Sequence, residues 1–78
     1  MDESIMDESI NEQLIKELLE ALDEESMTPT QLDDKLKKGL GKIETTLRYM
    51  FFQKWVEQDQ KTKDVFITVS GKKQLNKL

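Results

Sequence analysis

The chain has 78 residues, a formal net charge of −4, and neither cysteine nor histidine. This composition excludes disulfide scaffolds, thiol catalysis and imidazole general bases, and it removes the most common zinc ligands. No apolar run approaches the roughly 20 residues that span a bilayer, and the acidic start lacks the layout of a signal peptide. We therefore expect one small cytoplasmic domain without a membrane partner.

The charge divides along the chain. Residues 1–25 have ten acidic side chains and one basic side chain, a balance of −9, whereas residues 26–78 have six acidic and eleven basic side chains, a balance of +5. A locally basic face can attract nucleic acid even on an acidic protein. An ordinary mixed-charge surface with an acidic first helix is the alternative explanation.

The first ten residues repeat Met-Asp-Glu-Ser-Ile twice, which is too short a period for a repeat architecture. We expect residues 1–9 to form a flexible or helix-extending acidic N-terminus. Ser9 and Glu12 have the spacing of a capping box, and Ser4 could cap one turn earlier. A helix over about 10–23 follows, because apolar residues recur every four positions. These residues are Met6, Ile10, Leu14, Leu18 and Leu22.

A second helix starts at the sequence Thr28-Pro29-Thr30-Gln31. Threonine is a good cap, proline suits the first helical position, and Gln31 completes a capping box. Leu32 and Leu36 are expected to point inward. The helix should end near Lys37, because Gly39-Leu40-Gly41 breaks the helix and supplies a turn.

A third helix is predicted over about 41–53. At 100° per residue its core face contains Ile43, Leu47, Met50 and Phe51. The opposite face contains a mixture of basic, hydroxyl and aromatic side chains. These are Lys42, Thr45, Arg48, Tyr49 and Phe52.

Two strand-like segments follow, 55–57 and 65–69, both rich in β-branched and aromatic residues. The polar segment 58–64 between them is typical of a turn. Ser70 is placed to cap a last short helix, from which Leu75 and Leu78 would pack back. The expected fold class is α+β and mostly helical.

The spacing of Leu32, Leu36, Ile43, Leu47 and Met50, followed by Trp55 and Val56, resembles that of the winged helix-turn-helix family of transcriptional regulators. The resemblance covers residues 10–78. It implies three helices, a two-stranded β-hairpin wing and a short C-terminal helix. The chain departs from the family at Lys54, where glycine is frequent, and at Asp33, where a small residue is frequent.

The resemblance implies sequence-dependent binding of duplex DNA, with the helix over 41–53 in the major groove and the wing, about 58–64, on the DNA backbone. Arg48 would contact guanine, Thr45 a thymine methyl or a phosphate, and Lys42 and Tyr49 the backbone. Phosphate contacts are also expected from lysines at the wing tip and at the turn between the helices. These are Lys61 and Lys63 at the tip, and Lys35, Lys37 and Lys38 at the turn.

Phe52 points away from the predicted core, and exposed aromatic side chains often mark a contact surface. We expect a homodimer or partner interface formed by Met6, Ile10, Leu14 and Phe52, unless Phe52 is covered within the monomer. The same aromatic face and the acidic first helix would also suit a winged-helix adaptor that binds proteins instead of DNA.

No enzyme activity, cofactor, metal ion or small-molecule substrate is expected. The chain offers no nucleophile paired with a base, and Asp33 and Asp34 diverge by about 100° on a helix. The acidic pairs near the N-terminus lack the glycine turn of a calcium loop, and no glycine-rich phosphate loop is present.

Overall fold

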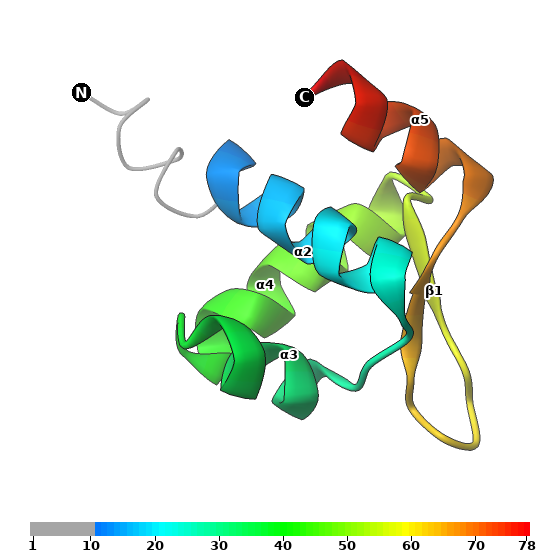
Figure 1. The fold of residues 1–78 in the computed structure, drawn as a ribbon. Coiled ribbons are helices and arrows are strands. Elements are labelled where there is room, and N and C mark those ends of the chain that lie inside the picture. The colour runs from blue at the N-terminus through cyan, green and yellow to red at the C-terminus, as the bar shows by residue number, and fades with distance from the viewer. Residues whose placement is uncertain (1–10) are drawn as a thin grey trace.

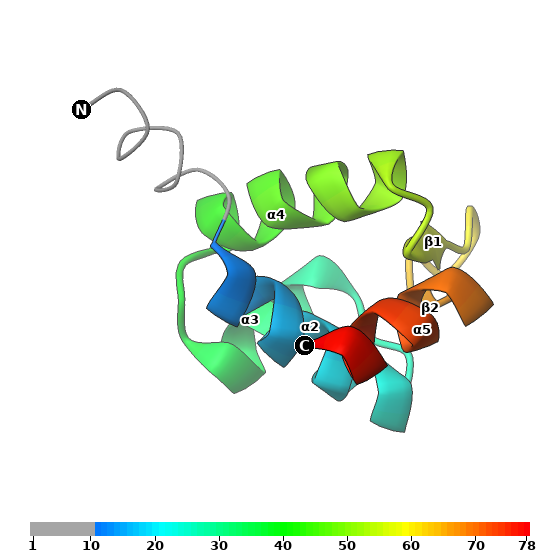
Figure 2. The same ribbon diagram turned by 90° about the horizontal axis from the view of Figure 1, so that it is seen from above.

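The computed structural model describes residues 11–78, which form a mostly helical α+β fold (Figure 1). This result confirms the predicted fold class. The helices are α2 (Glu12–Glu24), α3 (Pro29–Leu36), α4 (Leu40–Phe52) and α5 (Val69–Lys77). The strands are β1 (Val56–Gln58) and β2 (Val65–Ile67), which lie between α4 and α5. Seen from above, α4 lies on one side of the molecule, and α2 and α5 lie on the other (Figure 2).

The hydrophobic core is formed where α2, α3 and α4 meet the hairpin. The apolar stripe of α2 supplies nearly half of it, and Leu18 and Leu19 are completely buried. Leu14 belongs to this core with only 6% of its surface exposed. The prediction that Leu14 forms a dimer interface is therefore wrong, because the monomer already covers its side chain. Met6 and Ile10 lie outside the described residues.

Helix α2 begins at Glu12, two residues later than the expected start at about residue 10. Asn11 is the N-cap, and its Oδ1 accepts hydrogen bonds from the backbone N–H groups of Gln13 (2.8 Å) and Leu14 (3.2 Å). The predicted cap, Ser9, lies outside the described residues. Asparagine caps a helix as well as serine does, so pattern alone could not choose between them.

Helix α3 begins as predicted, with a complete capping box. The Thr28 hydroxyl accepts from the Gln31 N–H, and the Gln31 side chain accepts from the Thr28 N–H. Leu32 is fully buried, whereas Leu36 is half-buried at the edge of the core. The tight turn to α4 is fixed by the Asp33 side chain, which accepts from the Gly39 N–H at 2.7 Å.

Strands β1 and β2 pair antiparallel, with Val56 opposite Ile67 and Gln58 opposite Val65. On its other edge Val65 pairs with Met27, which lies between α2 and α3. The Met27 N–H donates to the Val65 carbonyl at 3.1 Å, and the Val65 N–H donates to the Met27 carbonyl at 2.7 Å. This bridge, which the sequence analysis missed, attaches the base of the hairpin to the helices.

Helix α5 is capped by Thr68, not by Ser70 as the sequence suggested. The Thr68 hydroxyl accepts from the Gly71 N–H at 3.0 Å, whereas Ser70 is exposed on the first turn. A Cβ atom at Gly71 would collide with the Trp55 carbonyl and lie 2.7 Å from Cγ1 of Ile67. Only glycine allows α5 to approach the end of α4 this closely, and that approach sets where α5 begins.

Candidate nucleic-acid interface

The outer face of α4 presents Lys42, Thr45 and Arg48 to solvent, as predicted. These residues lie opposite the buried face, on which Ile43, Leu47 and Met50 point into the core. Phe52 lies one turn beyond Arg48 on the same outer face and exposes 81% of its surface. Among the described residues nothing covers most of the Phe52 ring, so this face combines two cations, a hydroxyl and an exposed aromatic ring.

Tyr49 departs from the predicted arrangement. Its side chain is half-buried and packs edge-to-face against Trp55, with ring centroids 5.8 Å apart and an angle of 81° between the planes. The ring therefore closes the core at the end of α4 and does not project from the outer face. Helical geometry alone assigns Tyr49 to the contact face. It cannot show that Trp55, which lies outside the helix, extends the core to this side of α4.

The lysines of the α3–α4 turn are exposed, and they form ion pairs with acidic side chains. Lys37 pairs with Asp34 at 3.7 Å, and Lys38 pairs with Glu17 of α2 at 3.8 Å. Lys35 pairs with Glu24 at 3.6 Å. Exposed pairs of this kind contribute at most about 1 kcal/mol, so the lysines can exchange these carboxylates for phosphates at small cost.

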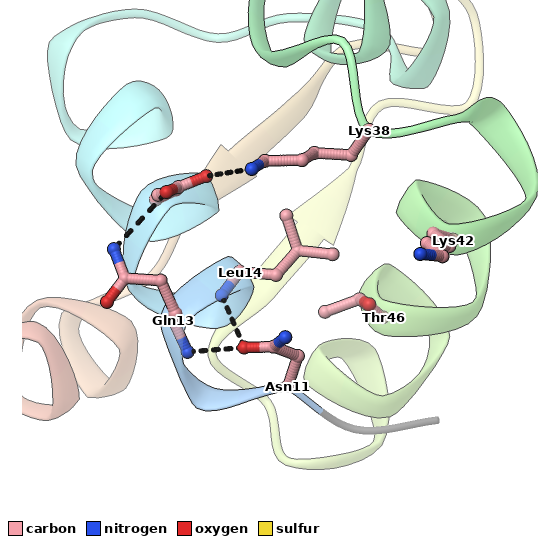
Figure 3. A pocket seen from close by; sticks show the side chains of 7 residues that line it. Asn11, Gln13, Leu14, Lys38, Lys42 and Thr46 are labelled. Atoms are coloured by element: carbon pink, nitrogen blue, oxygen red, sulfur yellow. Dashed lines mark hydrogen bonds and ion pairs between the residues drawn. The ribbon is translucent and has the colours of Figure 1, made fainter. Parts of the chain in front are cut away.

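Lys38 and Lys42 line a polar cleft of about 170 Å³ between α2 and α4 (Figure 3). Lys38 reaches across this cleft to Glu17, whose carboxylate also accepts from the Gln13 side-chain amide at 3.2 Å. Glu17 therefore already has two donors from the protein. The cleft places Lys42 on the side of α4 that is closer to α2.

Arg48 lies on the other side of α4, which faces the hairpin. Two adjoining clefts of about 260 and 350 Å³ separate α4 from the hairpin, and both are lined by Phe51 and Gln58. We call them together the hairpin groove. Arg48 lines the first cleft and Lys54 lines the second, each beside a glutamate, Glu44 or Glu57.

The hairpin turn exposes both Lys61 and Lys63, as predicted. Its shape is held by Asp59, whose carboxylate accepts from the backbone N–H groups of Lys61 (2.7 Å) and Thr62 (3.0 Å). The hydrogen bonds from the Thr62 and Lys61 backbones lower the pKa of Asp59 below its ordinary value of 3.8. The turn therefore holds its two lysines beside a carboxylate that stays ionised in mildly acidic solution.

The ion pairs among residues 11–78 include none of the four cations on α4 and the hairpin turn, which are Lys42, Arg48, Lys61 and Lys63. The paired lysines instead belong to α3, to its turn and to α5. Within the described chain, the cations of α4 and of the hairpin turn thus have no competing salt bridge.

Between residues 11 and 78 there is no group of three or more acidic side chains arranged to hold a metal ion. The same stretch contains no helix with the length and apolar character needed to cross a membrane.

No protein-family model, curated protein or solved structure matches this chain.

Sequence reasoning missed two residues of the hairpin groove, Lys54 and Gln58. Lys54 was noted only because it stands where glycine was expected, and Gln58 was assigned to the polar turn. A local pattern could not reveal that both side chains line a groove, since the groove exists only once the hairpin packs beside α4.

Proposed function

We propose that this chain is a winged helix-turn-helix protein that binds duplex DNA and regulates transcription. In this proposal α4 is the recognition helix, and the β1–β2 hairpin is the wing. The observation that carries it is the arrangement around α4: a capped helix α3 and a tight turn present Thr45 and Arg48 outward, beside a hairpin whose turn exposes Lys61 and Lys63.

The attachment of the hairpin to the helices supports the same assignment. The Met27–Val65 bridge joins the segment between α2 and α3 to the free edge of β2, so the hairpin is attached to the helical part on one edge. An antiparallel hairpin attached in this way extends from the helices and can lie along a DNA backbone while α4 enters the major groove.

Arg48 is the residue best suited to base recognition. Its guanidinium can donate two hydrogen bonds to the major-groove edge of guanine, and Thr45, one turn earlier, can contact a thymine methyl or a phosphate. Lys42, Lys61 and Lys63 would contact phosphates and fix the orientation of the protein on the duplex. Such contacts make the affinity fall steeply as the salt concentration rises.

The test is a titration of fluorescently labelled mixed-sequence duplexes, followed by selection of a preferred sequence, with wild type, Arg48→Ala and Lys73→Ala. The control variant Lys73→Ala removes the same charge from an exposed position on α5. We expect Arg48→Ala to weaken binding to the preferred sequence by roughly 5- to 150-fold, because a bidentate base contact is worth about 1–3 kcal/mol.

Lys73→Ala should change that affinity much less. The proposal would be wrong if wild type bound no duplex even at low salt, or if both variants weakened binding equally.

One observation favours a second function, that of a protein-binding adaptor. Phe52 is the most exposed large apolar residue of residues 11–78, and it lies on the outer face of α4 at the C-terminal end of the helix. Major-groove DNA offers few apolar surfaces apart from thymine methyl groups, whereas aromatic side chains are common anchors in protein interfaces.

Phe52→Ser separates the two functions, because this residue contributes little to the core. If α4 binds DNA, the variant keeps most of its affinity for the duplex. If the chain is instead an adaptor, wild type binds no duplex and Phe52→Ser loses the protein partner. Where that partner is a second copy of the chain, sedimentation velocity shows a dimer for wild type and a monomer for Phe52→Ser.

A further inference from the structure

Three non-glycine residues of the described chain have a left-handed backbone, and all three are lysines. Their φ angles are 58° at Lys37, 69° at Lys54 and 68° at Lys63. Left-handed backbone is unfavourable for residues with a Cβ atom, and glycine or asparagine usually occupies such positions. Lysine has no short side chain that could hydrogen-bond its own backbone as asparagine does, so each of these positions has a backbone cost that glycine would avoid.

Lys54 shows this conflict most clearly, because it lies in a complete Schellman motif at the end of α4. The Trp55 N–H donates to the Met50 carbonyl, and the Lys54 N–H donates to the Phe51 carbonyl, both at 3.0 Å. This pattern needs a left-handed residue at the position of Lys54, where glycine is strongly preferred. The motif is sealed by the contact between Tyr49 and Trp55.

The surroundings of Lys54 indicate what its side chain does. Lys54 is exposed and lines the half of the hairpin groove that is farther from Arg48, together with Gln58 and Gln60. Glu57 lines the same half, so an anion could bind there only if Lys54 offset that carboxylate. Arg48 supplies the positive charge of the other half.

We propose that Lys54 binds a phosphate of the DNA strand that lies along the hairpin groove, between α4 and the hairpin. This inference rests on the proposed function and adds a residue that the pattern of the family would replace by glycine. Arg48 and Lys54 would then hold the same strand at two points of the groove. The chain keeps lysine at Lys54 at the expense of stability, because a glycine there would fold better and bind DNA less well.

Three substitutions distinguish the effect of the left-handed backbone at Lys54 from the effect of its charge. Lys54→Gly removes both the unfavourable backbone conformation and the charge, Lys54→Gln removes the charge alone, and Lys54→Arg keeps the charge. Stability is measured by urea unfolding, and affinity is measured with a labelled duplex over a range of salt concentrations. Wild type and all three variants are examined as the full chain.

We expect Lys54→Gly to raise the equilibrium constant for folding by roughly two- to fivefold. The same variant should bind DNA more weakly, with a salt dependence smaller by about one phosphate contact. Lys54→Gln should lose the same affinity without gaining stability, and Lys54→Arg should bind like wild type.

The inference would be overturned if Lys54→Gly bound DNA with the affinity and salt dependence of wild type. The proposed function would still stand in that case, because wild type would bind the duplex. A Lys54→Gly variant less stable than wild type would overturn the premise of a backbone conflict. Failure of wild type itself to bind would overturn the proposed function, and this inference with it.

Discussion

Thr68 joins two parts of the chain through a single hydroxyl group. Its Oγ1 accepts from the Gly71 N–H at 3.0 Å, which caps α5, and it donates to the Lys54 carbonyl at 2.7 Å. The second bond ties the start of α5 to the turn that ends α4. Thr68 is therefore a cap and also a link between elements that are 14 residues apart in sequence.

We expect Thr68→Ala to lower the free energy of unfolding by about 1–2 kcal/mol, because it removes the cap and leaves a carbonyl without its donor. Ser70→Ala is the matched control, since Ser70 is exposed and its hydroxyl makes no hydrogen bond within the described residues. This control should change stability by less than about 0.5 kcal/mol. Equal losses in urea unfolding would show that Ser70 caps α5 in solution.

At the scale of residues, the sequence predicted the caps only where a single candidate existed. Thr28 and Gln31 form their box as predicted, because Pro29 allows no other start for α3. At α5 two hydroxyl residues compete, and the choice of Thr68 depends on the close contact between Gly71 and Trp55. That contact is made across the fold, so local sequence could not reveal it.

At the scale of elements, the hairpin turn depends on one ionised side chain. Asp59 accepts two backbone hydrogen bonds, which hold Lys61 and Thr62 in the turn, and the Asp59 N–H donates to the Asp64 carbonyl at 2.8 Å. The two bonds to the carboxylate favour its charged form, which is why the pKa of Asp59 is lowered.

This lowered pKa predicts how stability depends on pH. Because the folded pKa lies below the unfolded one, Asp59 contributes stability above the unfolded pKa and loses it as the pH falls through the folded pKa. The difference in urea midpoint between wild type and Asp59→Ala should therefore shrink between about pH 6 and pH 2.

Asp59→Asn is the control, because its side-chain oxygen still accepts hydrogen bonds but does not titrate. Its difference from Asp59→Ala should stay nearly constant over the same range. A difference between wild type and Asp59→Ala that did not change with pH would contradict the role assigned to the carboxylate.

The helices were predictable at this scale because their periodicity is local. The predicted range 41–53 for the third helix differs from α4 by one residue at each end, and Ile43, Leu47 and Met50 are all buried as expected. The Met27 bridge was not predictable in the same way. A single residue that pairs with Val65, far along the chain, leaves no alternation of apolar and polar residues to detect.

At the scale of the whole molecule, acidic and basic groups are separated. Helix α2 contributes Glu17, Asp23 and Glu24 to ion pairs with other elements. Glu12 and Glu20 are its other exposed acidic residues, and α2 lies on the opposite side of the molecule from α4 (Figure 2). A duplex bound at α4 would therefore face the cations, and the acidic helix would lie behind them.

The acidic helix should nevertheless weaken DNA binding from a distance. At roughly 20 Å, two unit charges in water interact with about 0.2 kcal/mol before screening, and several phosphates add their effects. We expect Glu20→Gln combined with Glu25→Gln to raise affinity by about twofold at low salt, without any new contact. The gain should vanish at 0.3 M salt, where charges this far apart are screened.

An affinity gain that persisted at high salt would show that one of these side chains lies near the duplex. Thermal unfolding is the control for stability, because both residues are exposed and lie outside the core.

The division of charge was visible in the sequence. The pairing of Lys38 with Glu17, 21 residues earlier, required the packed arrangement of α2 and α3.

The Met27–Val65 bridge attaches only the base of the hairpin to the helical part, so the base and the turn are held by different hydrogen bonds. At the base, Val65 is bonded to Met27 through both of its backbone groups and is completely buried. Between Gln58 and Asp64, the hydrogen bonds of the turn connect only residues of the hairpin itself. The base of the hairpin is thus fixed to the core, whereas the turn that carries Lys61 and Lys63 keeps its shape through hydrogen bonds of its own, so its surface contacts can change while the core stays undisturbed.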